Sequence, residues 1–535
     1  MQSLVVFPVI SYLKVYNIIL LLKMNIFCDI ITMFEKCREA TDMIKTGFDN
    51  EKYLKMQSEH IKQRIDKFGG KLYLEFGGKL YDDFHASRVL PGFKPDSKLR
   101  MLLQMKEQVE VVIVINASHI EKNKLRSDLG ITYDIDTLRL IDIFRSIGLY
   151  VGSVVMTCYA GQPQAKAFKK RLEGLGIKVY QHYAIEGYPS NIAKVVSDEG
   201  YGMNEYIETT RELVVVTAPG PGSGKMATCL SQLYHDHKRG IEAGYAKFET
   251  FPIWNLSLNH PVNLAYEAAT ADLNDVNMID PFHLDAYGET TVNYNRDVEI
   301  FPVVKAMLET IYGECPYKSP TDMGVNMAGN CIFDDDAVRK ASCDEIIRRY
   351  YTGLCDHKKG KTSDDTVYKL ELLMKKAGVT QNDRKVISPA LQKAALTGLP
   401  AAAVELNDGR ILTGKTSELL GSSSALLLNA LKALAGLDDE LHLISPETIQ
   451  PIQHLKVDHL GNRNPRLHTD EVLIALSICA ATDKNAQLAL EQIPKLKGCQ
   501  AHTSVMLSTV DIKQFKRLNV QLTSEAKYEN KRIYH

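Results

Sequence analysis

The stretch from Leu213 to Gly240, LVVVTAPGPGSGKMATCLSQLYHDHKRG, constrains the fold of this chain most strongly. Its first five residues form a short β-rich apolar run, residues 218–224 are too rich in glycine and proline for regular structure, and residues 225–239 repeat apolar side chains at helical spacing. A helix after such a loop directs its free N–H groups and its positive dipole end toward the loop. The stretch therefore predicts a strand, a loop and a helix, with an anion site, most often for phosphate, at the loop.

Lys225, in the first turn of the predicted helix, strengthens this interpretation. The helix dipole opposes a cation there by roughly 0.3–1 kcal/mol, and a bound anion would remove that conflict. The P-loop template G-x-x-x-x-G-K-[ST] is matched only in part, because Pro219 replaces its first glycine and Met226 replaces the hydroxyl that would hold magnesium. The predicted phosphate-binding residues are Gly220, Gly222, Ser223, Gly224, Lys225 and Thr228. Orthodox hydrolysis of a magnesium nucleotide and a glycine-rich turn without a ligand are the alternatives.

A second stretch, GRILTGKT at residues 409–416, matches the P-loop template letter for letter. However, Asn407-Asp408-Gly409 is a hairpin signal between the β-rich runs 402–405 and 411–413. Four template positions would then lie on a strand or at its ends, where they could not wrap around a phosphate. We therefore interpret residues 409–416 as a hairpin and the imperfect match at 219–226 as the phosphate site.

Upstream of the glycine loop, apolar strands alternate with amphipathic helices. The predicted strands are 71–76, 110–116, 150–157 and 178–182, and the predicted helices are 48–68, 96–108, 134–147 and 162–175. Such alternation predicts a mostly parallel sheet covered on both faces, with ligands at the carboxyl ends of its strands. Polar residues after the first strand are candidates for the opposite wall of the same cleft, although a turn with a solvated face explains each of them: Glu75, Gly77, Gly78, Lys79, Asp82, Asp83, His85 and Arg88.

Residues 259–302 form a long connection dense in polar groups, and long connections inside a compact domain are often functional. Its candidates are His260, Asn263, Glu267, Asp272, Asp280, His283, Asn293, Asn295, Arg296 and Asp297. Carboxylates with histidine can serve as acid and base, and arginine can bind phosphate oxygens. We predict Asp280, His283, Arg296 and Asp297 as catalytic residues. The alternative for each residue is a helix cap or a turn.

The rest of the chain predicts a helical domain and a second α/β domain. Asp334, Asp335 and Asp336 are interpreted as the charged first turn of a helix at 337–351, rather than as metal ligands. The elements after residue 388 resemble the order in cytidine deaminases, but H-x-E and P-C-x-x-C are missing, so a zinc deaminase is not expected. The polar run 462–470 is a further candidate for facing a ligand. The predicted domains are 46–315 (α/β with the phosphate loop), 316–387 (helical) and 388–523 (α/β), with an extension at 1–45 and a tail at 524–535.

Composition excludes several classes of protein. The formal net charge of the 535 residues is −1 without a long basic run, which argues against a dedicated nucleic-acid binder. The ten cysteines form no C-x-x-C pair, which argues against structural zinc and a disulfide framework, so no metal site is predicted and a reducing cytoplasm is expected. Residues 1–45 are more apolar, but Lys14 and Lys23 leave only eight uncharged residues between them, short of the ~18–20 that span a bilayer. We expect an extension from a mis-assigned start there, with an amphipathic membrane-surface segment as the alternative.

Five strings point to a known family: GFDNEKYLKMQ, LYLEFGGKLYDDFHASRVLPGF, VVVTAPGPGSGKMATCLSQLYH, NYNRDVEIFP and GVNMAGNCI. They resemble the bacterial Uncharacterised Protein Family 0371, also called domain of unknown function 1846, over roughly residues 46–523. The resemblance implies a cytoplasmic bacterial protein with an N-terminal α/β domain, a helical insert and a C-terminal α/β domain. It implies no established activity. Some members carry the label ATP-dependent peptidase, which we do not adopt because this sequence has no G-x-S-x-G or H-E-x-x-H motif.

The sequence thus predicts a cytoplasmic enzyme that binds a phosphorylated small molecule or nucleotide on the loop from Gly220 to Lys225. If the cofactor is a nucleotide with magnesium, Asp272 or Asp280 would hold the metal in place of the missing hydroxyl. The alternatives are a non-catalytic nucleotide-responsive sensor and a structural assembly protein. No nucleic-acid or membrane partner is expected, and a homo-oligomer remains compatible with the sequence.

Overall fold

The computed structural model describes residues 46–529, except residues 79, 82, 127–128 and 274. The predicted extension at 1–45 lies outside the described residues, as does the end of the predicted tail. The chain forms two compact units. The N-terminal unit comprises Thr46–Arg349 and Tyr368–Val379, and the C-terminal unit comprises the described residues of Tyr350–Val367 and Thr380–His535. Residues from the segment 316–387, predicted as a helical domain, belong to both units.

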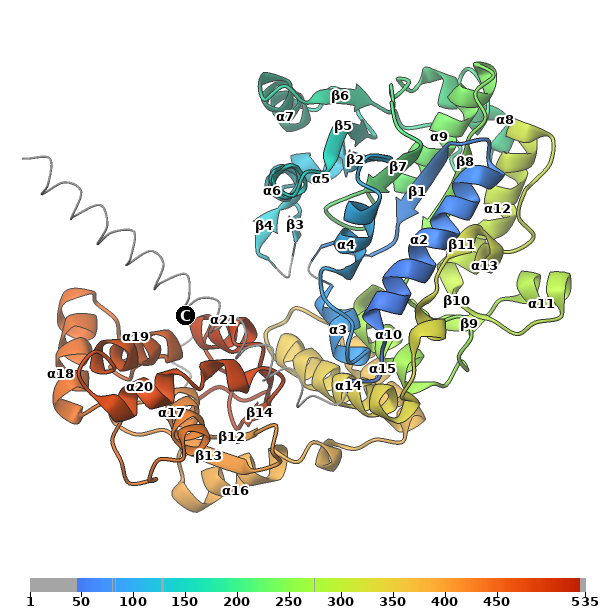
Figure 1. Ribbon diagram of the computed structural model, residues 1–535. Coiled ribbons are helices and arrows are strands. Elements are labelled where there is room, and N and C mark those ends of the chain that lie inside the picture. The colour runs from blue at the N-terminus through green and yellow to red at the C-terminus, as the bar shows by residue number, and fades with distance from the viewer. Residues whose placement is uncertain (1–45, 79, 82, 127–128, 274, 530–535) are drawn as a thin grey trace, which may run out of the picture. The chain divides into compact units, whose positions relative to one another are not determined.

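A seven-stranded sheet with every neighbouring pair parallel forms the centre of the N-terminal unit (Figure 1). Its order is β11-β8-β1-β7-β2-β5-β6. The strands are β1 (Leu72–Phe76), β2 (Val109–Asn116), β5 (Tyr150–Thr157), β6 (Lys178–Gln181), β7 (Leu213–Thr217), β8 (Gly244–Phe248) and β11 (Gly324–Val325). The predicted parallel α/β class is therefore confirmed. Two short antiparallel pairs lie outside this sheet: β3 (Leu125–Arg126) with β4 (Ile131–Thr132), and β9 (Asn277–Ile279) with β10 (Val292–Tyr294).

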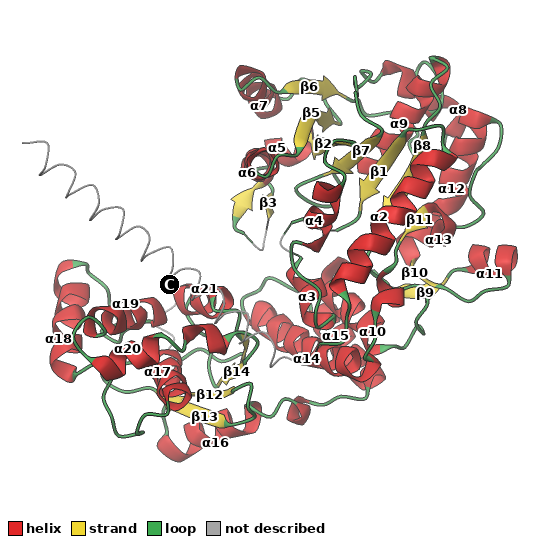
Figure 2. Cartoon of the chain, in the orientation of Figure 1, coloured by secondary structure: helices red, strands yellow, loops and turns green. Residues whose placement is uncertain are grey.

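Helices cover both faces of this sheet (Figure 2). One face carries Tyr73, Val214 and Tyr245, which share a buried apolar core with α9 (Lys225–Lys238) and α12 (Asn295–Tyr312). Alternate strand residues point to opposite faces. On the other face, the ammonium of Lys98 in α4 (Ser97–Gln104) lies 5.8 Å from the centre of the Phe248 ring. The two-sided cover explains why the strands are apolar on both faces, as their sequence pattern predicted.

The remaining helices of the N-terminal unit connect these strands or extend the unit at its edges. They are α2 (Asn50–Lys67), α3 (Phe84–Val89), α5 (Ala117–Glu121), α6 (Tyr133–Ser146), α7 (Pro163–Gly174), α8 (Ile192–Val195), α10 (Pro261–Ala269), α11 (Pro281–Tyr287) and α13 (Pro320–Met323). Two longer helices, α14 (Asp335–Lys358) and α15 (Asp364–Ala377), contribute residues to both units. The side chain of Asp334 accepts a hydrogen bond from the Ala337 N–H at 3.0 Å. This bond confirms the capping interpretation of Asp334.

The C-terminal unit has a four-stranded mixed sheet in the order β13-β12-β14-β15. The strands are β12 (Ala401–Glu405), β13 (Ile411–Lys415), β14 (Gln500–Thr503) and β15 (Gln521–Ser524). Its helices are α16 (Ile387–Thr397), α17 (Ser422–Ala435), α18 (Pro446–His454), α19 (Thr469–Cys479), α20 (Lys484–Leu490) and α21 (Thr509–Arg517). The antiparallel pairing of β12 with β13 confirms the hairpin interpretation of residues 409–416. Leu443 and Ile444, in the apolar run 441–444, are buried in the core of this unit without forming a strand.

Within the described residues, no helix combines the length and the apolar character that crossing a membrane requires.

Candidate functional site

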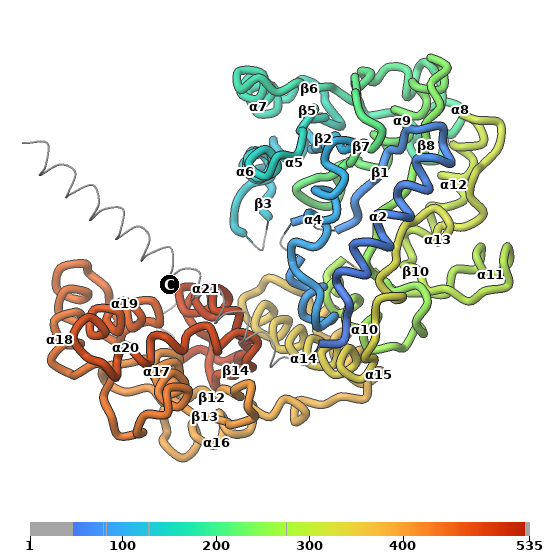
Figure 3. The backbone as a smooth tube through the Cα atoms, viewed as in Figure 1, coloured from blue at the N-terminus to red at the C-terminus, as the bar shows by residue number. Residues whose placement is uncertain are grey.

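The glycine loop lies at the carboxyl end of β7, which is a central strand between β1 and β2. The chain runs from β7 through residues 218–224 directly into α9 (Figure 3). Gly222 and Gly224 have φ angles of +74° and +89°, which favour glycine. A Cβ atom on Gly220 would lie 2.2 Å from the Tyr133 hydroxyl, so a side chain there would force the loop or Tyr133 to move. Three of the predicted residues are thus glycines for conformational or steric reasons.

The hydroxyls of Ser223 and Thr228 stabilise the loop from within. Ser223 Oγ donates to the Gly220 carbonyl at 2.7 Å, and Thr228 Oγ1 donates to the Gly224 carbonyl at 3.0 Å. Both residues are buried. The N-cap residue of α9 is Gly224, and no side chain caps that end of the helix. The loop is therefore held in shape by its own side chains, while among the described residues no side chain caps the first N–H groups of α9.

Polar side chains from the ends of β2 and β5 support the loop, and sequence reasoning missed them. Asn116 Nδ2 donates to the Gly222 carbonyl at 3.3 Å, and Thr157 Oγ1 donates to the Ser223 carbonyl at 2.6 Å. A signal was present, because each of these residues is the polar last residue of a predicted apolar strand. In a parallel sheet such residues meet at one edge.

His119, in α5, is the imidazole beside the loop. Its Cε1 atom lies 3.5 Å from the position of a Cβ on Gly222, and its Nε2 atom lies 3.4 Å from Lys124 Nζ. An ammonium only donates, so Nε2 accepts and the neutral ring carries its proton on Nδ1. Within the described residues Nδ1 is buried and has no hydrogen-bond partner. Burial, followed by the charges of Lys124 and Lys122, lowers the pKa of His119, which keeps the ring neutral near pH 7.

Lys225 extends toward the end of β1, where it meets Glu75. Its Nζ lies 3.9 Å from Glu75 Oε1, and the Tyr245 hydroxyl donates to Glu75 Oε2 at 2.7 Å. The two charged side chains are 16% and 11% exposed, so the pair is largely withdrawn from water. Among the described candidates for the predicted opposite wall, Glu75 is the one that faces the loop lysine. It gives Lys225 a local counter-charge in the absence of a bound anion.

A second group of charges lies one strand further, at the carboxyl end of β8. Lys247 is paired in register with Glu75 across β1 and β8. Its ammonium is in close contact with the carboxylate of Asp297 and the hydroxyl of Tyr294, and lies 3.0 Å from Glu249 Oε1. Burial disfavours the charged ammonium, but the combined attraction of Asp297, Tyr294, Glu249 and Glu75 outweighs it and raises the pKa of Lys247 well above its usual value. Asp297 is thus the predicted catalytic residue that the structure brings into the neighbourhood of the loop lysine.

The other three predicted catalytic residues are engaged elsewhere. Asp280 is fully buried, caps α11 through the N–H groups of Phe282 and His283, and accepts two further hydrogen bonds from Thr321. His283 Nδ1 lies 2.8 Å from Ser319 Oγ. Arg296 is half exposed, and its Nε lies 2.8 Å from Asp275 Oδ1.

These contacts bear on the suggested magnesium ligands. Asp280 already accepts four hydrogen bonds from the protein, and Asp272 is exposed in the short turn Ala271–Leu273. The part of the chain that the structure describes contains no group of three or more His, Cys, Asp or Glu side chains able to hold a metal ion.

The remaining candidates from the sequence serve local contacts. Asp83 caps α3 and lies 2.8 Å from Lys98 Nζ, while His85 and Arg88 lie 3.5 and 2.9 Å from the buried carboxylate of Glu345. Lys79 and Asp82 lie outside the described residues. In the polar run 462–470, His468 caps α19 together with Glu471. Asp83, His85 and Arg88 are thus engaged with Lys98 and Glu345.

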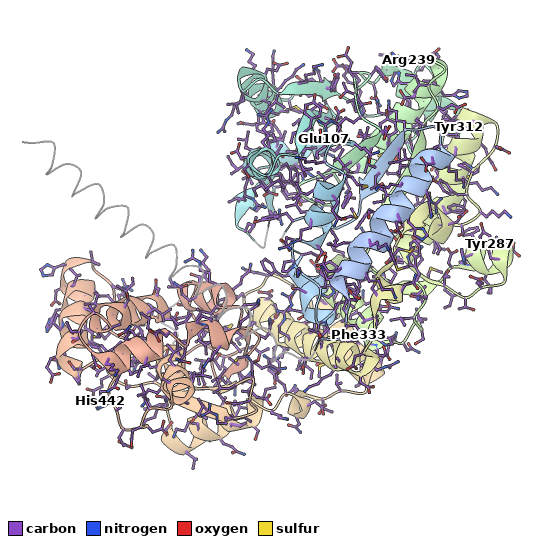
Figure 4. The ribbon with its side chains drawn as sticks, in the orientation of Figure 1. Glu107, Arg239, Tyr287, Tyr312, Phe333 and His442 are labelled. Atoms are coloured by element: carbon purple, nitrogen blue, oxygen red, sulfur yellow. The ribbon has the colours of Figure 1, made fainter. Side chains whose placement is uncertain are left out.

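A surface hollow of about 920 Å³ lies in the N-terminal unit between α11, α12 and residues 313–318. Figure 4 labels Tyr287 and Tyr312, the last residues of these two helices. The hollow is lined by Phe282, Phe301, Lys305 and Tyr317 among others, and by none of the loop residues. Neither Lys225 nor the charged residues near it line this hollow.

Comparison with known proteins gives the family. Models described as "Domain of unknown function DUF1846, N-terminal" and "Domain of unknown function DUF1846, C-terminal" match residues 46–378 and 382–534. The chain belongs to the DUF1846 family. A UPF0371 protein of Corynebacterium diphtheriae is 60% identical over 494 residues, which are 92% of this chain and 99% of the relative. A UPF0371 protein of Streptococcus pneumoniae (strain JJA) is 58% identical over 492 residues, which are 92% of this chain and 100% of the relative.

These matches confirm the resemblance carried by the five sequence strings. The UPF0371 and DUF1846 names describe no reaction, so the function of this DUF1846 protein is inferred from its site.

Proposed function

We propose that this DUF1846 protein is an enzyme that binds a phosphorylated small molecule or nucleotide through a phosphate at the loop Gly220–Lys225. The observation that carries the proposal is the loop itself. It joins a central parallel strand to a helix whose first N–H groups no side chain caps, and it places a lysine in the first helical turn. Glycine loops of this kind bind phosphate through backbone N–H groups and the helix dipole.

Two side chains support an anion at this loop. Lys225 is held near the loop by Glu75, at 3.9 Å, and would neutralise a phosphate. His119 approaches Gly222 with its Cε1–Nε2 edge, and its buried Nδ1–H has no partner in the described part of the chain. A phosphate on the loop would give Lys225 a second anionic partner beside Glu75.

The catalytic part of the proposal rests on the carboxyl groups beside the loop. Glu75 contacts Lys225 directly, and Asp297 and Glu249 surround Lys247 on the neighbouring strand. Burial, followed by the nearby charge of Asp297, keeps the pKa of Glu249 well above its usual value, so Glu249 is a candidate acid. A carboxyl whose pKa is raised, beside other carboxyl groups, is an arrangement that suits acid and base catalysis.

The finer features of the fold are part of the same proposal. We take the turn between β7 and α9 as P-loop-like, with a carboxylate at the end of a neighbouring strand, and the sheet order β13-β12-β14-β15 as deaminase-like without the zinc chemistry. The eight described cysteines are thiols outside any disulfide, which fits the reducing cytoplasm we propose as the location. A homo-oligomer remains part of the proposal, and no nucleic-acid or membrane partner is included.

The test is a thermal-shift screen of wild type against nucleotides and other phosphate esters, followed by calorimetric titration and assays for turnover. A ligand at a hundred times its Kd stabilises the folded state by about 2.7 kcal/mol. We expect Lys225→Ala to lose this stabilisation. Lys238→Ala, at the other end of the same helix and paired with Asp198, should keep it.

If the ligand stabilises Lys225→Ala as much as Lys238→Ala, the loop is not the phosphate site. The same holds if it stabilises wild type but neither variant. Binding without consumption of any ligand would identify a sensor instead of an enzyme.

A further inference from the structure

Glu345, in the part of α14 that belongs to the N-terminal unit, is a buried carboxylate shared by three arginines. Arg348 holds both of its oxygens, with Nε 2.5 Å from Oε2 and Nη2 2.6 Å from Oε1. Arg349 Nε donates to Oε1, and Arg88 Nε, from α3, donates to Oε2, each at 2.9 Å. One negative charge therefore faces three positive charges.

The neighbouring titratable groups do not restore the balance. His85, also on α3, has its Nδ1 3.5 Å from Glu345 Oε1. Burial lowers the pKa of this histidine, so the ring is neutral near pH 7 and adds no charge. Asp272 attracts Arg349 more weakly than Glu345 does, and its side chain is exposed. Even with Asp272 counted, the cluster keeps a surplus of positive charge.

A balanced ion pair at the start of the same helix shows the difference. Asp83, which caps α3, lies 2.8 Å from Lys98 Nζ, and one cation meets one anion there. Withdrawing surplus charge from water costs free energy. Burial lowers the pKa of Arg88 to about 10, the repulsion of the other two arginines adds to this shift, and Glu345 opposes it. A bound anion would relieve the repulsion.

Two of the arginines have hydrogen-bond donors to spare. Arg88 and Arg349 use only Nε on Glu345, and within the described residues their Nη1 and Nη2 groups make no hydrogen bond. None of these four nitrogens is buried, and the two side chains are 21% and 25% exposed. The outer edge of each guanidinium therefore presents two N–H donors to solvent, in the fork that matches two oxygens of an oxyanion.

The charge and the number of donors favour phosphate over carboxylate. A carboxylate has one charge and two oxygens, which one guanidinium edge satisfies. A phosphate monoester has three acceptor oxygens and a charge of about −1.5 to −2 at pH 7. Such a group can meet both arginines and offset the surplus charge. Because Glu345 already fixes the two Nε atoms, less side-chain freedom is lost when the anion binds.

We propose that Arg88 and Arg349, held in place by Glu345, form a second phosphate-binding site in the N-terminal unit, separate from the glycine loop. The site takes inorganic phosphate or the phosphate of a small monoester. It does not depend on the function proposed for the loop, because it uses none of the loop residues. Its donors are partly exposed and share their charge with Glu345, so we expect it to bind phosphate more weakly than the loop does.

The test is calorimetric titration of the full chain carrying Lys225→Ala, which removes the lysine of the loop. We expect this variant to keep one weak site for inorganic phosphate. Adding Arg88→Gln or Arg349→Gln should lower the affinity of that site about tenfold or more, because each change removes charge-assisted hydrogen bonds. Arg339→Gln is the matched control. It removes the same charge from α14, where Arg339 is paired with Asp335 and half exposed, and should leave the affinity unchanged.

A parallel titration with glycerol phosphate distinguishes the two sources of the phosphate. Either order of affinity supports the site, and the tighter ligand names the source. The site is refuted if the Arg88→Gln and Arg349→Gln variants bind phosphate as tightly as the Arg339→Gln variant. If one of the two does not fold, the other decides.

The outcomes also separate this site from the loop. If wild type binds phosphate and Lys225→Ala alone abolishes all binding, the loop stands and the arginine site is refuted. If wild type has a single site that Arg88→Gln weakens and Lys225→Ala does not, the arginine site stands and the loop is refuted. Failure of wild type to bind phosphate or any phosphate ester overturns both.

Discussion

Two stretches of this chain match the same phosphate-binding template, and the poorer match has the local structure that phosphate binding requires. Residues 219–226 lack the first glycine and the hydroxyl of the template, yet they join β7 to α9 at the carboxyl edge of a parallel sheet. Residues 409–416 match every letter, yet they run through the β12–β13 hairpin. A phosphate needs converging N–H groups, and an extended strand directs its N–H groups alternately to either side. The secondary structure around a match therefore predicts a phosphate site better than the agreement with the template does.

The glycines in the two stretches have different roles. Gly220 and Gly224 serve a loop that turns into a helix, with Tyr133 close to the first and a left-handed φ at the second. Gly414 lies on β13, where an added Cβ would come within 2.3 Å of the Leu426 backbone nitrogen in α17. One glycine set shapes the loop that we propose as an anion site, and the other permits a helix to pack on a strand.

Substitution of one glycine from each stretch should therefore give opposite results. Gly414→Ala is expected to cost about 1–3 kcal/mol of unfolding free energy through overpacking, and to leave phosphate affinity unchanged. Gly220→Ala should lower phosphate affinity about tenfold or more, because the loop must move away from the Tyr133 hydroxyl. Denaturant titration and calorimetry measure the two quantities. A loss of phosphate affinity in Gly414→Ala would reverse our assignment of the two stretches.

A gain of function would sharpen the comparison further. Met226 occupies the position where the template places the magnesium-binding hydroxyl. Met226→Ser should raise the affinity for a nucleotide several-fold in the presence of magnesium, and not in its absence. Met226→Ala is the control for the lost side-chain volume. An identical response of the two variants to magnesium would show that this loop does not hold a metal-bound nucleotide in the P-loop manner.

Sequence reasoning succeeded where local pattern determines local structure. The strands around the loop, the parallel sheet and the hairpin at 409–416 all follow from periodicity and turn residues, which act over a few neighbours. Asp297 was selected for the density of polar groups around it, and the structure joins it to Lys247, next to Glu75 in register.

The rest of the site depends on which distant elements meet. Asp280 and His283 look like catalytic residues in the sequence, but their side chains bind Thr321 and Ser319, about forty residues away. Glu249 was not selected, because a glutamate directly after a strand carries no local signal. Its contacts with Lys247 and Asp297 become visible only when β8 and α12 pack together. Burial and pairing are tertiary properties that composition and spacing do not contain.

The smallest expected effect concerns the imidazole of His119, which lies beside the glycine loop. Burial and two lysines lower the pKa of His119, so the ring is neutral at pH 7 and gains its charge only as the pH falls through that lowered pKa. A protonated ring beside Gly222 would add a cation to the proposed anion site. We expect the affinity for sulfate, whose charge is constant over this range, to rise several-fold between pH 8 and pH 5. In His119→Gln, calorimetry should give a flatter profile, because the amide does not titrate. If the two profiles coincide, His119 does not face the bound anion, and the support that it gives to the phosphate loop is lost.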